Sequence, residues 1–252
     1  MRTGPEIQTM PEAKTTLQLL GGVEIHGLDR ELANGLLGQP KHVALLSYLA
    51  IEGAGGRWHR RDLLVALFWP ELDQQHARGA LRKGVHALRG VFSANAIESR
   101  GDEELRLADG AVTCDAVEFV VDIEAGRLLR ALEGYKGDLM PGFHLSGCLE
   151  LDRWLEDERT DLRERAAAAA IAMARLRGDD SALTEAGAWA KRAVRYSWND
   201  ERTLRRALTL IARGGDRAGA LSLYDEFASR LKADLDALPS DETVALVKQI
   251  RG

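Results

Sequence analysis

Residues 74–92 constrain the fold of this chain more than any other segment, because they divide into an apolar side and a cationic side. On a helical wheel with about 100° per residue, one group of apolar side chains lies within about 40° of Leu81. This group consists of Ala77, Leu81, Val85, Leu88 and Phe92. The segment is therefore predicted to form an amphipathic helix that buries its apolar stripe against neighbouring elements.

The other side of this predicted helix is cationic or polar, and the sequence has no acidic residue between Asp73 and Glu98. The cationic side chains are Arg78, Arg82, Lys83, His86 and Arg89. The major groove of duplex DNA admits one helix, and arginine binds both backbone phosphates and guanine edges. We therefore expect this helix to bind DNA. Because Arg82 and Arg89 lie off the apolar stripe, replacing both with alanine is expected to abolish specific binding and to leave the fold intact.

Two glycines, Gly79 and Gly90, also lie on the cationic side. Each costs about 1 kcal/mol relative to alanine in a helix interior. Their presence suggests that another molecule approaches the helix backbone closely at these positions.

The elements around this helix follow a recognisable order. Alternating apolar residues from Thr15 to about Leu32 predict two short strands joined at Gly21-Gly22. Apolar spacing predicts helices over residues 43–51 and 63–68, and residues 97–107 predict a β-hairpin with an acidic tip at 101–104. Strands, three helices and a final hairpin are the order of a winged helix-turn-helix, whose third helix enters the major groove.

Residues 113–252 are predicted to be all α-helical, with a TPR-like arrangement. Helical spacing occurs at about 150–177, 181–196, 200–213, 216–234 and 241–250. Short connections between these stretches imply antiparallel neighbours, and the small residues Ala186, Ala190, Ala207 and Ala220 are expected at their contacts. The predicted fold is thus mainly α. It has a flexible tail at 1–14, a winged helix-turn-helix with small sheets at 15–112 and a helical domain at 113–252.

The charge distribution agrees with a local nucleic-acid site in an acidic protein. The chain has a formal net charge of −5, but residues 36–100 carry nine Lys or Arg against five acids. Beyond the predicted third helix, the candidate DNA contacts in this segment are Lys41, Arg57, Arg60, Arg61 and Arg100. Backbone N–H groups at the helix start near Arg61 are also expected to hold a phosphate. The hairpin tip Asp102-Glu103-Glu104 is expected to be repelled by DNA, so the wing should contribute little.

Nothing in the sequence predicts an enzyme. It has no HExxH, no GxSxG and no GxxxxGK[ST] motif. Cys114 and Cys148 form neither a CxxC pair nor a disulfide framework. We therefore expect no catalytic site, cofactor or metal. A cytoplasmic, nucleoid-associated protein is expected, because the sequence shows no secretory signal and no membrane-spanning run.

An ordered set of motifs resembles SARP-type regulators, the antibiotic regulatory proteins. The DNA-binding half is similar at residues 36–41 (LLGQPK), 44–49 (ALLSYL), 61–64 (RDLL), 67–71 (LFWPE) and 77–82 (ARGALR). The later part resembles the bacterial transcriptional activator domain at 113–115 with Phe119, 135–143 (YKGDLMPGF), 154–156, 215–218, Tyr224 and 239–243.

The resemblance implies an OmpR-like winged helix followed by a TPR-like activator domain. It further implies binding to double-stranded promoter DNA at repeated sites and contact with RNA polymerase. Because a single winged helix covers only one short half-site, two protomers, a homodimer on repeated half-sites, are expected on DNA. The family's groove-binding positions fall on Arg78, Arg82, Lys83, His86 and Arg89. This sequence departs from the family in its acidic wing tip and in Gly84 and Gly90.

Two alternatives stay open from the residues. One is a protein-interaction module that no longer binds DNA, which the acidic net charge and wing tip favour. The other is an enzyme. In the helical half, five arginines form either a partner surface or solvated helix faces: Arg192, Arg195, Arg202, Arg205 and Arg206.

Overall fold

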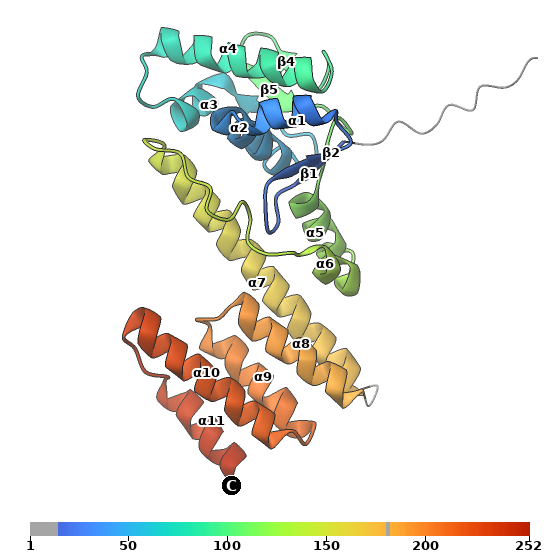
Figure 1. Cartoon of the computed structure of the whole chain (residues 1–252), viewed down its shortest axis with the longest axis vertical. Coiled ribbons are helices and arrows are strands. Elements are labelled where there is room, and N and C mark those ends of the chain that lie inside the picture. Colours follow the sequence, from blue (N-terminus) through green and yellow to red (C-terminus); the bar gives the residue numbers. More distant parts are fainter. Residues whose placement is uncertain (1–14, 180–181) are drawn as a thin grey trace, which may run out of the picture. The chain divides into compact units, whose positions relative to one another are not determined.

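The computed structural model describes residues 15–179 and 182–252, which form two compact units (Figure 1). The expected tail at 1–14 lies outside the described residues. The N-terminal unit extends to Glu118 and also includes Lys136–Glu156, whereas the C-terminal unit comprises Phe119–Tyr135 and Asp157–Gly252. The compact units therefore do not coincide with the two consecutive domains expected at 15–112 and 113–252. The reason is that residues 136–156 contact the N-terminal unit.

The N-terminal unit combines four helices with two small sheets. Its helices are α1 (Arg30–Leu37), α2 (Pro40–Ile51), α3 (Arg61–Phe68) and α4 (Gln74–Val91). Its strands are β1 (Thr16–Gln18), β2 (Glu24–His26), β3 (His59–Arg60), β4 (Ile97–Arg100), β5 (Glu104–Leu107) and β6 (Thr113–Cys114). One sheet has the order β2-β1-β6, with β1 antiparallel to β2 and parallel to β6. The other has the antiparallel order β3-β5-β4. We call β4, β5 and the turn 101–103 the wing.

The core of this unit lies under α4, as the wheel predicted, except that Phe92 follows the end of the helix and is only half-buried. Ala77, Leu81, Val85 and Leu88 are each at most 3% exposed. Helix α4 contacts α1, α2, α3 and β4 (Figure 1), and α2 contributes a nearly continuous buried surface from Val43 to Ala50. The apolar stripe therefore sets the rotation of α4 about its own axis.

The segment after β2 differs from the sequence-based expectation. Strand character was expected to continue to about Leu32, but α1 begins at Arg30. The side chain of Asp29 caps this helix by accepting hydrogen bonds from the backbone N–H groups of Glu31 (2.8 Å) and Leu32 (3.3 Å). Burial of Ala33 and Leu36 further stabilises this helix. The alternating apolar pattern just before it had favoured a strand in the sequence-based prediction.

Residues 136–156 join the N-terminal unit through backbone pairing and a side-chain cluster. Met140 N donates to the carbonyl of Leu19 at 2.7 Å, and Leu20 forms an antiparallel bridge with Leu139. Trp154 packs edge-on against Tyr48, with ring centroids 4.9 Å apart, and its Nε1 donates to Glu52 at 2.8 Å. Such long-range pairing leaves no signal in local sequence periodicity.

The range predicted to be all helical, 113–252, begins with strand β6, which pairs with β1 and so belongs to the first sheet. In the described residues after β6 there are seven helices, as predicted for the rest of this range. They are α5 (Asp115–Glu124), α6 (Leu128–Gly134), α7 (Leu149–Asp179), α8 (Leu183–Tyr196), α9 (Glu201–Arg213), α10 (Arg217–Leu235) and α11 (Asp241–Arg251). The division between the two units falls within α5 and within α7.

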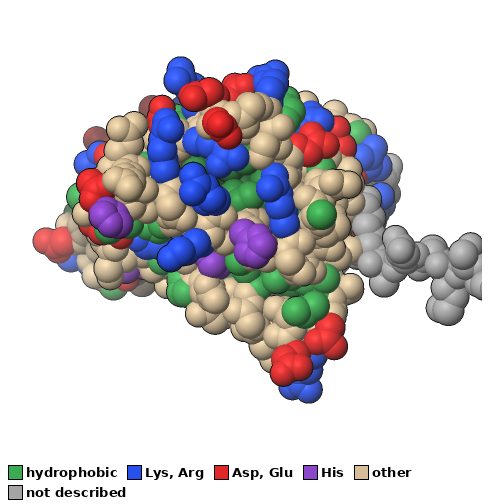
Figure 2. All heavy atoms as spheres, turned by 90° about the horizontal axis from the view of Figure 1, so that it is seen from above, with side chains coloured by type: hydrophobic (Ala, Val, Ile, Leu, Met, Phe, Trp, Pro, Cys, Tyr) green, Lys and Arg blue, Asp and Glu red, His purple; other side chains and the backbone are tan. Residues whose placement is uncertain are grey.

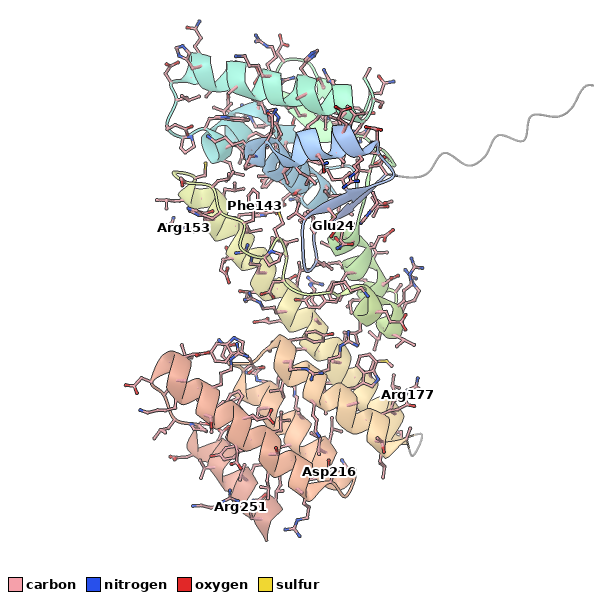
Figure 3. The ribbon with its side chains drawn as sticks, in the orientation of Figure 1. Glu24, Phe143, Arg153, Arg177, Asp216 and Arg251 are labelled. Carbon is pink, nitrogen blue, oxygen red and sulfur yellow. The ribbon has the colours of Figure 1, made fainter. Side chains whose placement is uncertain are left out.

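Consecutive helices α8 to α11 pack against one another in the C-terminal unit, and the small residues predicted at these contacts are all buried. Figure 3 shows Asp216 at the start of α10, where its carboxylate accepts a hydrogen bond from Gly219 N at 2.8 Å. A Cβ at Gly219 would lie 2.0 Å from this carboxylate, so any other residue there would require the Asp216 side chain to shift.

Two of the five arginines left open in this unit make internal contacts. Arg192 donates to the carbonyl of Leu132 at 2.8 Å, and Arg205 donates to Thr243 at 3.0 Å and pairs with Glu242 at 3.0 Å. These two side chains therefore hold the helices of the unit together. Among the helices in the described residues, none combines the length and apolarity needed to span a membrane.

Replacing Leu81 with alanine tests the packing of α4. Leu81 is 1% exposed, so we expect Leu81→Ala to lower the free energy of unfolding of the N-terminal unit by about 2–5 kcal/mol. Leu63→Ala is the matched control, because Leu63 is 51% exposed on α3, and its cost should be about 1 kcal/mol or less. Urea unfolding followed by tryptophan fluorescence measures both. Equal midpoints for the two variants would contradict the assigned rotation of α4.

Candidate nucleic-acid interface

Helix α4 begins at a well-formed cap and presents its cationic side outward. The side chain of Asp73 accepts from the backbone N–H groups of Gln75 (3.0 Å) and His76 (3.1 Å). The 18 residues that follow span about 27 Å. Because one side of the helix is buried, the side chains half a turn away face solvent.

Three predicted contacts on α4 are free to bind a ligand. Arg82, Lys83 and His86 are exposed, and within residues 15–179 and 182–252 their side chains have no hydrogen-bond or ion-pair partner. Figure 2 shows the face that includes α4, where Lys, Arg and His side chains gather near the centre and acidic side chains lie mostly around them. This surface therefore attracts anions.

Arg78 and Arg89, the other two predicted contacts on α4, are engaged within the protein. Arg78 Nη2 donates to Asp62 of α3 at 2.7 Å, and this hydrogen bond raises the pKa of the guanidinium. Arg89 donates to the carbonyl of Ile97 through Nε (2.9 Å) and Nη2 (2.6 Å), and Nη2 also donates to Ser99 Oγ at 3.0 Å. Arg89 thus joins α4 to strand β4 of the wing, a role that sequence spacing could not show.

Four of the five cationic side chains of α4, all except Lys83, border a cleft of about 340 Å³ between α4, the start of α3 and the wing tip. The cleft is lined by Arg61, Arg78, Leu81, Arg82, Val85, His86, Arg89 and Asp102. The lining therefore contains four guanidinium groups, one imidazole and one carboxylate. We call this the arginine cleft.

Arg61 is the member of the arginine cleft that lies outside α4. Its Nη2 donates to Ser99 at 3.2 Å, while its Nε is buried without a hydrogen-bond partner in the described part of the chain. Burial lowers the pKa of this guanidinium, and the positive charges of the neighbouring arginines lower it further. The negative charge of Asp102 acts in the opposite direction and raises it. An arginine nonetheless stays protonated, so the cleft holds uncompensated positive charge.

The backbone at the start of α3 is less available than the sequence suggested. The N–H of Arg61 donates to the carbonyl of Glu103 in the wing at 2.8 Å. One of the donors expected to hold a phosphate is therefore already used by the wing, and this contact also holds the wing tip beside the arginine cleft.

The remaining predicted contacts lie outside the arginine cleft, and three of them are paired with acids. Lys41 pairs with Glu71 at 2.7 Å, and Arg57 pairs with Glu52 at 3.0 Å. Arg100 forms a salt bridge with Glu104 at 2.5 Å and stacks over Trp58, 4.7 Å from the ring centroid. Arg60, at the cap of α3, is exposed. Exposed ion pairs of this kind exchange partners at little cost.

The three glycines of α4 fall into two classes. A Cβ at Gly84 would lie 3.2 Å from Cδ2 of His42, so this glycine allows α4 to pack closely on α2. Burial there also lowers the pKa of His42, which favours its neutral form. A Cβ at Gly79 or Gly90 would have no atom of the described residues within 4 Å. Packing within the protein therefore explains only Gly84.

Two residues of this site have roles that were not predicted from the sequence. Asp102 was expected only to be repelled by DNA as part of the wing tip, and in the structure it also lines the arginine cleft. Ser99 accepts hydrogen bonds from both Arg61 and Arg89. A lone serine in a predicted hairpin carries no signal for such a contact, because its partners lie on two other elements.

Arg89 and Arg82 should differ in their effect on stability. Arg89→Ala removes three hydrogen bonds from a charged group to the wing, so we expect a loss of about 1–3 kcal/mol in the free energy of unfolding. Arg82→Ala should change it by about 0.5 kcal/mol or less, because Arg82 is exposed. Urea unfolding compares them, and an unchanged midpoint for Arg89→Ala would remove the proposed link between α4 and the wing.

Comparison with known proteins supports the family resemblance. The model of the bacterial transcriptional activator domain matches residues 123–251, which is half of the chain. A search of curated proteins finds no match. Among solved structures, Mycobacterium tuberculosis EmbR in complex with a low-affinity phosphopeptide is 21% identical, with a TM-score of 0.62.

That structural match covers 94% of this chain and 65% of the EmbR chain, so this chain spans less than two thirds of its length. At this identity the likeness shows the fold alone, which is mainly α with small N-terminal sheets as predicted. The family assignment comes from the domain match and confirms the SARP-type resemblance. The chain belongs to the family of bacterial transcription regulators that carry the bacterial transcriptional activator domain.

Proposed function

We propose that this regulator binds double-stranded promoter DNA by inserting α4 into the major groove. The proposal is carried by the contrast between the two sides of α4, one apolar and buried and the other cationic and exposed. Its apolar stripe is buried, while Arg82, Lys83 and His86 are exposed and unpaired among the described residues. A helix held in this way presents arginine to guanine edges and lysine to the phosphate rims.

The contacts divide by geometry into two kinds. Arg82 and His86 lie on the exposed side of α4, which faces the base edges when the helix lies in the major groove. Arg60, Lys41, Arg57 and Arg100 lie on other elements of the N-terminal unit and suit phosphates on the outer rim. Because the last three are already paired with acids, DNA must replace those partners when it binds.

The family of the C-terminal unit supports a second part of the proposal, contact with RNA polymerase by the helical domain. One winged helix covers a single short half-site, so two protomers on adjacent repeats form the functional complex. Such a complex acts at promoters on the nucleoid.

Binding and its salt dependence test the proposal directly. A duplex selected from a random library should bind the full chain with an affinity that falls steeply between about 50 and 200 mM salt. Arg82→Ala should weaken binding to this duplex by about 10- to 100-fold, because a bidentate guanine contact contributes about 1–3 kcal/mol. Fluorescence anisotropy measures both effects.

Arg206→Ala provides the matched control, since Arg206 is an exposed arginine on α9 of the C-terminal unit. It should leave DNA affinity nearly unchanged. Full affinity in Arg82→Ala would refute the assignment of α4 as the recognition helix. If no selected duplex binds the native chain, a protein-interaction module without DNA binding becomes the better explanation.

Gly79→Ala separates fold stability from DNA contact. A Cβ at this position meets no atom of the described residues, so alanine should stabilise the N-terminal unit by about 1 kcal/mol through helix propensity. The same methyl group should weaken DNA binding if DNA approaches the backbone of α4 closely. Thermal unfolding and anisotropy on one sample test both effects, and tighter binding together with higher stability would count against this approach.

A further inference from the structure

The wing places one carboxylate among the cations of the arginine cleft. Asp102 lines this cleft with Arg61, Arg78, Arg82 and Arg89. In the described residues the Asp102 carboxylate forms no hydrogen bond and no ion pair within 4.0 Å. It therefore acts on the arginines only through its charge and occupies none of their donors.

Unused donors make the arginine cleft an incomplete site. Arg61 Nε and Arg78 Nε are both buried, and neither has a hydrogen-bond partner in the part of the chain that the structure describes. A buried polar group without a partner is unfavourable, and a charged donor gains most from a charged acceptor. An oxyanion with several acceptor oxygens would meet both requirements.

The position of the arginine cleft indicates which oxyanion it takes. It lies between the exposed side of α4 and the wing. A helix in the major groove is bounded on both sides by backbone phosphates, so a phosphate lies next to any cleft along its flank. The phosphodiester group carries one negative charge and two free oxygens, which fits a site with several guanidinium donors.

We propose that the arginine cleft binds a backbone phosphate of DNA, and that the negative charge of the Asp102 carboxylate competes electrostatically with this phosphate without occupying the arginine donors. The inference rests on the proposed function of α4. Arg61 N donates to Glu103 O next to the tip, and Gly101 adopts a φ of 57°, so the turn holds Asp102 near the arginines. Because a phosphate has no base identity, Asp102 weakens binding to every duplex by the same factor.

Asp102→Asn tests this competition in the full-length chain, because it removes the charge and keeps the size of the side chain. Asp109→Asn is the matched control, since Asp109 is an exposed acid of the same unit that does not line the arginine cleft. Anisotropy is measured with a selected duplex and with a random-sequence duplex. Calorimetry measures binding of inorganic pyrophosphate without DNA.

We expect Asp102→Asn to tighten binding about fivefold on both duplexes, and Asp109→Asn to change it less than about twofold. Pyrophosphate should also bind Asp102→Asn more tightly than the native chain. If the native chain binds DNA but Asp102→Asn does not exceed Asp109→Asn, the competition is refuted and the proposed function stands. Tighter binding to the selected duplex alone would also refute it, because Asp102 would then contact a base.

The pyrophosphate measurement separates failure of this inference from failure of the proposed function. If no variant binds DNA but pyrophosphate binds Asp102→Asn more tightly than the native chain, the arginine cleft is a small-anion site and DNA is refuted as its ligand. If neither DNA nor pyrophosphate binds any variant, both proposals are wrong. Circular dichroism of each variant confirms that these comparisons are made on folded protein.

Discussion

Burial of the apolar stripe of α4 is the interaction on which the rest of the N-terminal unit depends. Leu81 and Leu88 pack into a core shared with α2 and α3. A helix that buries one side has no freedom to rotate, so the direction of every other side chain on it follows. Exposure of Arg82, Lys83 and His86 is therefore a consequence of hydrophobic packing.

The wing turns a cationic helix into a structured site. Arg89 and Arg61 both donate to Ser99, which links α4, the start of α3 and strand β4. The hydrogen bonds of these two arginines hold elements of the N-terminal unit together, whereas Arg82 makes none with the described residues. Residues of the same type on one surface thus have different roles, according to whether a protein acceptor lies within reach.

Local charge explains how an acidic protein can present a cationic surface. The net charge of −5 is a sum over the whole chain, whereas the arginine cleft contains four guanidinium groups and one carboxylate. Over distances longer than the Debye length, about 8 Å at physiological salt, distant acids contribute little. Asp102 lines the same cleft, so its charge acts on these arginines where distant acids do not.

The amino-acid sequence by itself determined the helices with strong periodicity, the buried stripe of α4 and the side that its cations share. These features are local, because a period of 3.6 residues relates side chains along one element. The ordered motifs also pointed to the family of the C-terminal unit. Helix α1 was not predicted from the sequence. An alternating apolar pattern runs up to it, and its own signal is only a capping aspartate followed by eight residues.

Only the tertiary structure decided which arginines are free and which are engaged. Arg89 meets Ile97 and Ser99 because the wing folds back along α4, and Asp102 faces the arginine cleft because Glu103 is bonded to the start of α3. The return of residues 136–156 to the N-terminal unit is of the same kind. Each of these contacts joins elements whose relative positions depend on the whole fold, and no periodicity along the chain encodes them.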